Sequence, residues 1–274
     1  MMQFSVIMSV YRNDKPEFVA RALESITVLQ TRKPNEVVLV VDGPVPDGLS
    51  ELIGRYTADS PELYNIIWLP ENKGLGNALR IGVSAAKYEI IARMDSDDLS
   101  LPDRFERQIA YMETNPQCDL LGGQISEFID DESNSVGKRI VPCRHEDILA
   151  LLKGRCPFNH MSVMALRSRI IAVGNYLDWH FNEDYYLWIR MAEAGCRFAN
   201  LPDVLVNVRV GKDMYARRGG WKYFRSEEGL QRYMLAHHLI GWRRYLFNIT
   251  IRFLIQVTIP NRLRGFIFQK LFRE

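Results

Sequence analysis

Three aspartates are crowded into four positions of the segment YEIIARMDSDDLSLPDR, residues 88–104, where Asp95, Ser96, Asp97 and Asp98 follow an apolar run. Neighbouring carboxylates repel one another, so such a cluster is costly unless it binds a cation. Mg²⁺ and Mn²⁺ prefer oxygen ligands, often one or two carboxylates with substrate phosphates and water. A helix cap at Ser96 or Asp98 is the simpler alternative, but it needs only one of these residues. The cluster therefore predicts a divalent-metal site.

The first hundred residues alternate between strand and helix patterns. This alternation indicates where in the fold the aspartate cluster lies. Strands are expected where short apolar runs occur, at 4–10, 36–41, 64–69 and 89–94, and helices where apolar residues recur at helical spacing, at 16–29, 49–56 and 76–86. Such alternation predicts a parallel sheet with right-handed crossovers. In these sheets ligands bind beyond the carboxyl ends of the strands.

Polar residues follow each expected strand at this edge. Ser9 and Tyr11 end the first strand, Asp42 ends the second, residues 72–76 follow the third, and residues 95–98 follow the fourth. Since the carboxyl ends of parallel strands meet at one edge, this convergence predicts a single ligand site built from four loops.

After residue 104 the alternation fades, and the chain is expected to divide into 1–104, 105–215 and 216–274. Residues 120–129 and 137–141 predict a hairpin, 146–152 and 185–194 helices, 162–166 a strand, and 198–210 two short strands around Pro202. From Trp221 onward the pattern is helical, with a break at Pro260.

Composition is that of a soluble globular protein, with 47% hydrophobic and 25% charged residues. Residues 240–274 carry seven Lys or Arg and one Glu, which indicates a basic tail on a mildly acidic body. The net charge of +2 gives no reason to expect nucleic acid as a partner. Four cysteines without a CxxC pair predict reduced thiols in a cytoplasmic protein. We expect neither a signal peptide nor a membrane span.

Five blocks occur in the order and spacing of the family 2 glycosyltransferases: SVYRND at 9–14, VVDGP at 40–44, ENKGLGNALRIG at 71–82, MDSDD at 94–98 and NEDYYLWIRM at 182–191. Over about residues 3–210 the chain resembles that family. The resemblance implies the GT-A fold, an α/β, Rossmann-like, mostly parallel sheet with helices on both faces, here with a C-terminal helical extension. It also implies an inverting, metal-dependent transfer from a nucleotide sugar.

On this resemblance Asp95 and Asp97 form the DxD motif and ligate Mn²⁺ or Mg²⁺, with Asp97 on the donor diphosphate and Asp95 nearer the ribose. Tyr11 resembles the residue that stacks on uracil, and Asp42 the acceptor for its N3–H, where cytosine carries an acceptor instead. Core packing for Tyr11 and a turn for Asp42 stay open as alternatives. The expected nucleotide-sugar site comprises Ser9, Tyr11, Asp42, Asn72, Gly74, Asn77, Arg80, Asp95 and Ser96.

The block at 182–191 is expected to carry the general base, because an inverting displacement must take a proton from the acceptor hydroxyl. By the family's ED motif Asp184 is the first candidate and Glu183 the second, since an ionised carboxylate within hydrogen-bond reach can accept that proton. The alternative is helix capping by Asn182, with the two acids favouring the helix dipole. Both interpretations can hold together.

Two further residues are candidates for acceptor binding. Trp188 lies four residues past Asp184 on the same helical face, and His160 precedes a strand, as in relatives that use lipid-linked acceptors. Core packing is the alternative for Trp188. Arg209, Arg217 and Arg218 belong to a segment that either closes over the diphosphate or is a solvated basic loop.

The C-terminal segment has the pattern of a basic amphipathic helix. Its polar positions recur every four residues, at Arg244, Asn248, Arg252 and Gln256. Its apolar face comprises Tyr245, Ile249, Phe253 and Val257. This predicts an interfacial anchor on anionic lipid, with packing on the protein body as the alternative.

The sequence therefore predicts an enzyme that moves a sugar from a UDP-sugar to a hydroxyl of a lipid-linked oligosaccharide in O-antigen or capsule synthesis. It is expected to act in the cytoplasm, peripherally bound to the inner face of the cytoplasmic membrane. Galactose is the first choice of sugar, before N-acetylglucosamine, N-acetylgalactosamine and glucose. Alternatives are transfer to polyprenyl phosphate, which needs no base, and a non-catalytic nucleotide-sugar-binding subunit. A phosphatase would carry its DxD on the first strand.

Overall fold

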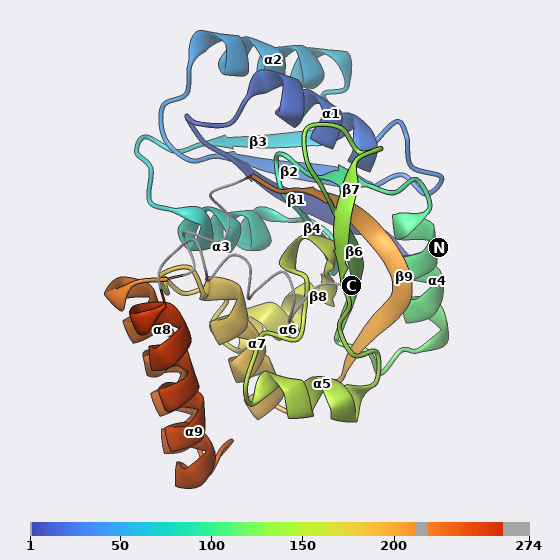
Figure 1. The fold of residues 1–274 in the computed structure, drawn as a ribbon. Coiled ribbons are helices and arrows are strands. Elements are labelled where there is room, and N and C mark those ends of the chain that lie inside the picture. Colours follow the sequence, from blue (N-terminus) through green and yellow to red (C-terminus); the bar gives the residue numbers. More distant parts are fainter. Residues whose placement is uncertain (1, 212–218, 260–274) are drawn as a thin grey trace.

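The computed structural model describes residues 2–211 and 219–259, and its strands form one sheet with helices on both faces (Figure 1). The strands are β1 (Phe4–Val10), β2 (Glu36–Val41), β3 (Tyr64–Trp68), β4 (Ile90–Met94), β5 (Leu99–Ser100), β6 (Leu120–Phe128), β7 (Ser135–Arg139), β8 (Met164–Leu166) and β9 (Phe198–Arg209). Their order in the sheet is β3-β2-β1-β4-β8-β6-β9-β5, and β7 pairs with β6.

Helices pack on both faces of this sheet. They are α1 (Pro16–Ile26), α2 (Asp47–Asp59), α3 (Leu75–Ala85), α4 (Arg104–Thr114), α5 (His145–Leu152), α6 (Arg167–Ala172), α7 (Glu183–Glu193), α8 (Trp221–Ala236) and α9 (Trp242–Phe253). A short turn of 3₁₀-helix, η1 (His160–Ser162), precedes β8, and a π-helical turn, η3 (Leu254–Thr258), continues α9.

The parallel half of the sheet follows the prediction. β3, β2, β1 and β4 are paired in parallel, and every residue of β2 is buried, as expected for a strand covered on both faces. One core layer joins the sheet to α1, α2 and α4, and the other joins it to α3 and α7. Both layers leave the carboxyl ends of β1, β2 and β4 at one edge, where the candidate site lies.

The second half corrects one prediction. Residues 198–209 form the single strand β9, not two short strands around Pro202. Proline cannot donate to a strand ladder, but here the register of β6 against β9 shifts around Gln124, whose Nε2 donates to Leu201 O at 2.8 Å. The Gln124 side chain thus satisfies the Leu201 carbonyl where the ladder is interrupted, and the strand continues. Two further differences are β7, which lies two residues earlier than predicted, and β5, which the sequence did not predict.

β8 connects the two halves, because it lies antiparallel between β4 and β6. β6 and β9 then pair in parallel over most of their length. The sheet therefore runs without interruption through residue 104, and the division into parts at that residue stays a prediction.

The C-terminal helices α8 and α9 lie side by side at the margin of the molecule (Figure 1). Phe224, Leu230 and Met234 of α8 are buried, and Leu230 and Met234 pack with α7 in the core. Pro260, where a helix break was predicted, lies outside the described residues. Over the described ranges no helix is both long and apolar enough to cross a bilayer. All four cysteines lie within these ranges and are free thiols.

Candidate active site

The Asp95–Asp98 loop leaves β4 at the edge where β1 and β2 also end, and two of its residues hold the loop in place. The buried Asp98 carboxylate accepts a hydrogen bond from the Arg209 backbone N–H at 2.9 Å, which ties the loop to the end of β9. Ser96 Oγ donates to Asp14 Oδ2 at 3.0 Å. Asp97 is exposed and Asp95 partly so, which leaves these two carboxylates at the surface of the site.

The loop carries more negative charge than its surroundings neutralise. Partial burial and the charges of Asp95 and Asp14 raise the pKa of Asp97 to about 6. Burial, followed by Asp95 and Asp97, raises the pKa of Asp98 well above its usual range. Arg93 on β4 pairs with Asp95. Excess negative charge on oxygen donors is the chemistry that suits a hard divalent cation.

The protein by itself supplies an incomplete coordination shell. Among residues 2–211 and 219–259 no group of three or more His, Cys, Asp or Glu side chains is arranged to hold a metal ion. A cation bound to Asp95 and Asp97 would therefore take its remaining ligands from substrate phosphates and water, as Mg²⁺ commonly does.

Asp42 fixes the neighbouring loop. Its carboxylate accepts the backbone N–H groups of Lys73 and Gly74, both at 2.9 Å, and Asn72 Nδ2 donates to Asp42 O at 3.1 Å. Gly43 allows this approach: its φ is +86°, and a Cβ atom there would lie 2.5 Å from the Asn72 nitrogen. Asp42 therefore has the turn-holding role that the sequence left open, and its contact with uracil stays a prediction.

The remaining nucleotide candidates reach the same edge or the adjoining helix. Tyr11 is 39% exposed just beyond β1, Ser9 is half-buried at its end, and Gly74, with φ +86°, precedes α3. Asn77 and Arg80 follow on α3, where Arg80 Nη2 donates to Asn77 Oδ1 at 2.8 Å. The exposed ring of Tyr11 is suited to stacking on a base.

The acidic pair begins α7 and lies next to the first turn of α3. A methyl group at Gly76 would lie 3.3 Å from the Glu183 Cβ atom. Burial, then the charge of Asp184, raises the pKa of Glu183 to about 7. Cys156 Sγ donates to Asp184 Oδ2 at 3.7 Å. The Asn182 side chain donates to Ser226 Oγ at 3.0 Å and accepts no hydrogen bond from the first turn of α7, so it does not cap the helix. Glu183 and Asp184 do lie in that first turn, where acidic residues favour the helix dipole.

His160 and Trp188 lie beneath the site. Trp188 is completely buried, with the rings of Phe158 and His160 edge-on to it, so it has the core-packing role that the sequence left as its alternative. His160 Nε2 shares a hydrogen bond of 2.8 Å with Tyr176 OH. Burial, then the charge of Arg93, holds the His160 pKa well below its usual value, so the imidazole is neutral. Its acceptor role stays a prediction.

Sequence reasoning missed two residues and misjudged a third. Asp14 links the loop after β1 to Ser96, and Arg93 lies under Asp95; the available signal was a basic residue inside the apolar strand IIARM. Arg209 packs its guanidinium on the rings of Phe18 and Phe128. It therefore holds the Asp95–Asp98 loop in place and does not close over the diphosphate as predicted. Arg217 and Arg218 lie outside the described residues.

Residues 5–173 match the model of the family described as Glycosyl transferase family 2, and residues 90–272 match that of Glycosyl transferase family group 2. The chain belongs to glycosyl transferase family 2, has the GT-A fold, and is a glycosyltransferase of the EC 2.4 class. The predicted family, fold and enzyme class are thereby confirmed.

Two curated relatives match this chain over almost their whole length. The amylovoran biosynthesis glycosyltransferase AmsE of Erwinia amylovora is 39% identical over 97% of this chain and 98% of its own. The UDP-Gal:alpha-D-GlcNAc-diphosphoundecaprenol beta-1,3-galactosyltransferase of Escherichia coli is 35% identical over 99% and 97%. Among solved structures, S. aureus TarS 1–349 in complex with UDP-GlcNAc has a TM-score of 0.69 at 16% identity, over 92% of this chain and 73% of that one, a likeness of fold.

Proposed function

We propose that this enzyme transfers a sugar from a UDP-sugar to a hydroxyl of a lipid-linked saccharide in surface-polysaccharide assembly. The observation that carries the proposal is one edge of the sheet where Asp95 and Asp97 lie near the acidic pair of α7, with the first turn of α3 against Glu183. One carboxylate pair suits a diphosphate–metal complex and the other suits proton transfer. Galactose on a diphospholipid-linked acceptor is the first combination to test, because the Escherichia coli relative is named for it.

Asp97 and Asp95 would hold Mn²⁺ or Mg²⁺. Their oxygen donors, and the excess of negative charge around them, fit such an ion. When bound, the cation stabilises the negative charge that develops on the departing nucleoside diphosphate. The chain's own contribution at this point is to present the two carboxylates on a loop fixed at both ends, by Asp98 to β9 and by Ser96 to Asp14.

Asp184 is proposed as the base that takes the proton from the acceptor hydroxyl as it attacks the anomeric carbon in line. With its pKa raised to about 7, Glu183 keeps a proton in part of the molecules at neutral pH. A pKa near the working pH also suits a general base, so Glu183 stays the alternative, and Asp184 comes first because it matches the family's ED motif. General-base catalysis by a positioned side chain is worth about 10²–10⁴-fold in rate.

Exchange of each acid for its amide tests this assignment. Asp184→Asn keeps the shape of the side chain but removes the base, so kcat should fall by about 10²–10⁴-fold while UDP-sugar affinity stays within a few-fold. Glu183→Gln is the matched variant, with a smaller expected loss. Turnover near wild type in Asp184→Asn, with collapse in Glu183→Gln, would move the role to Glu183. Full activity of both on a polyprenyl phosphate would instead support an acceptor that needs no base.

We also propose that the surface of α8 and α9 rests on an anionic membrane, and here the structure changes the basis of the prediction. Asn248, Arg252 and Gln256 of the expected polar stripe face the body: Arg252 pairs with Glu227 at 2.6 Å, and Asn248 Nδ2 donates to Gln231 and to Lys153 O. Glu227 also accepts from Gln256 at 2.8 Å. The helix is therefore turned with its polar stripe inward.

Large apolar side chains cover the outside as a result. The exposed ones are Trp221, Trp242, Leu246, Phe247, Phe253 and Leu254. Arg243 and Arg244 are exposed beside them, and the sequence that follows residue 259 adds four more Lys or Arg. Aromatic and apolar groups flanked by cations suit the interface of an anionic bilayer. Such a contact would place the enzyme at the inner face of the cytoplasmic membrane, where a lipid-linked acceptor is available.

A further inference from the structure

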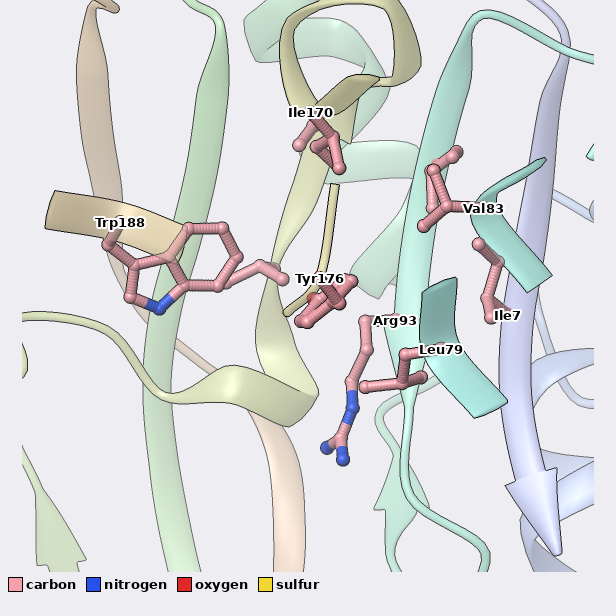
Figure 2. Close-up of a pocket in the computed structure, with 10 residues that line it drawn as sticks. Ile7, Leu79, Val83, Arg93, Ile170, Tyr176 and Trp188 are labelled. Carbon is pink, nitrogen blue, oxygen red and sulfur yellow. The ribbon is translucent and has the colours of Figure 1, made fainter. Parts of the chain in front are cut away.

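Arg93 is a buried cation with unused hydrogen-bond donors. It is 4% exposed on β4, where its side chain shares a face of the sheet with Ile91. Figure 2 shows its guanidinium pointing away from the apolar side chains of Ile7, Val83 and Ile170. Nη2 pairs with Asp95, whereas Nε and Nη1 have no hydrogen-bond partner among the residues that the structure describes.

Unused donors at this depth are unfavourable. Arginine stays charged in proteins, and a buried N–H group without a partner has lost the hydrogen bonds that it makes to water in the unfolded chain. The Arg93 charge acts on groups from three sides: Asp95, Asp97 and Asp98 beyond β4, His160 and Tyr176 below, and Glu183 at the start of α7. Its Nε and Nη1 nitrogens nevertheless have no hydrogen-bond partner among the described residues, as expected where a bound ligand supplies the missing acceptors.

The position and the charge of the surroundings define the class of ligand. Arg93 lies between the loop proposed to hold the donor diphosphate and the acid pair proposed to activate the acceptor, which is where the transferred sugar must lie. Since Asp95 already neutralises Arg93 and further carboxylates surround it, an additional anion is disfavoured here. A neutral ring bearing hydroxyl groups supplies acceptors without adding charge.

We propose that Nε and Nη1 of Arg93 donate hydrogen bonds to hydroxyl oxygens of the donor's sugar ring, while Nη2 holds Asp95. This inference rests on the proposed function and deepens it, because it makes Arg93 a residue that selects the sugar. The competing role is purely positional: Arg93 orients Asp95, and the sugar never touches it.

Comparison of two ligands that differ only by the sugar separates these roles. Arg93→Lys keeps a positive charge near Asp95 but removes the fork of donors. Calorimetry with Mn²⁺ should show UDP affinity within about threefold of wild type, and UDP-galactose affinity at least tenfold weaker. Equal losses for UDP and UDP-galactose would establish the positional role and overturn the inference, as would no loss for either ligand.

Arg190→Lys is the control for loss of a buried guanidinium. Arg190 lies on α7, is buried, donates to Val173 O and Asn175 O, and also leaves its Nε without a hydrogen-bond partner in the described part of the chain. This variant should melt earlier yet keep the wild-type ratio of UDP to UDP-galactose affinity. A change of that ratio as large as in Arg93→Lys would show that general destabilisation causes the effect, which would overturn the inference.

A second measurement on the wild-type protein keeps the inference testable if Arg93→Lys does not fold. Monodeoxy UDP-sugars each lack one ring hydroxyl, and at least one should bind tenfold more weakly than its parent. Equal binding of all of them would overturn the inference alone. A wild-type protein that binds UDP with Mn²⁺ but none of a panel of UDP-sugars more tightly than UDP would also count against Arg93 only. Absence of any UDP or UDP-sugar binding would overturn the proposed function and this inference together.

Discussion

The acidic side chains around the end of β4 differ in what holds them, and this difference decides which can serve a ligand. Asp98 is buried and accepts a hydrogen bond from the Arg209 backbone N–H. Asp14 accepts from Ser96 and from the Tyr11 backbone N–H. Asp95 is paired with Arg93, whereas Asp97 is exposed. Substitution of Asp97 should therefore affect metal binding most, and substitution of Asp98 should affect the stability of the fold most.

Asp97→Ala is expected to lower turnover at least 10³-fold and to remove the effect of Mn²⁺ on UDP affinity, because the protein loses its most exposed metal ligand. Asp98→Ala is the neighbouring control: it should lower the melting temperature by several degrees, since the Arg209 N–H loses its acceptor. Calorimetry of UDP with and without Mn²⁺ measures the first effect. An unchanged Mn²⁺-dependent affinity in Asp97→Ala would refute the assignment.

The raised pKa of Glu183 makes a prediction about stability and pH. Between its ordinary value near 4.5 and about 7, the folded protein holds a proton that the unfolded chain releases. The proton on Glu183 therefore stabilises the folded state at low pH, and this contribution is lost as pH rises through about 7. Without metal, the melting temperature of wild type relative to Glu183→Gln should therefore fall between pH 5 and pH 8. If the melting temperatures of the two proteins instead change equally with pH across that range, the pKa of Glu183 is not raised.

At the scale of elements, the sequence predicted those parts whose pattern depends on burial alone. The continuous β-branched run of β2 and the apolar spacing of α3 required no knowledge of neighbours. β9 was predicted wrongly because Gln124, distant in sequence, donates to the Leu201 carbonyl next to Pro202, where the strand ladder is interrupted. The periodicity of α9 correctly grouped Asn248, Arg252 and Gln256 on one face, but that this face turns inward is determined by its partners, which are Glu227 and Gln231 of α8 and the carbonyls of Lys153 and Gly154.

The same reasoning limits what could be known of the site. DSDD and the acid pair of α7 are visible as sequence patterns, since clustered charge is conspicuous in an apolar context. The sequence does not show which residues a given side chain will contact in the folded protein. That Asp42 would hold the Lys73–Gly74 turn, or that Trp188 would be buried, depends on how α3 and α7 pack against the sheet.

The contact between α8 and α9 should depend strongly on the Glu227 carboxylate. Arg252 and Glu227 are both largely buried, so Glu227→Ala leaves an unpaired charge inside and should cost about 3 kcal/mol. Glu132→Ala removes the acid of an exposed pair with Arg21, away from these helices, and should cost no more than about 1 kcal/mol. Chemical denaturation of both variants gives the comparison. Equal losses would mean that the inward stripe contributes nothing beyond a surface ion pair.

At the scale of the whole molecule, the proposed membrane contact makes the apolar outside of α8 and α9 the side of the enzyme that faces lipid. Trp242 is 62% and Phe247 58% exposed, so the double variant Trp242→Ser, Phe247→Ser should keep its melting temperature. It should bind vesicles that contain anionic lipid more weakly than wild type does. Binding of wild type should also weaken with salt, because exposed charges are screened over about 10 Å at 0.1 M ionic strength.

Co-sedimentation with anionic and with neutral vesicles tests this orientation. Deletion of residues 240–274 is a poor test, because it removes Asn248 and Arg252 from buried positions and would destabilise the body. Wild-type protein that stays in solution with anionic vesicles would exclude the membrane contact. Equal sedimentation of wild type and the double variant would show that other residues carry it.

The place of β8 in the sheet also has a consequence for how the chain folds during synthesis. β6 leaves the ribosome before β8, yet it reaches β4 only through β8. Until residues 164–166 emerge, the nascent chain therefore carries a finished parallel half whose β4 edge is open, and open apolar edges favour association with other chains. The long pairing of β6 with β9 must wait longer still, and such non-local pairing folds slowly. We therefore expect chains arrested before residue 160 to aggregate more than chains arrested past residue 210.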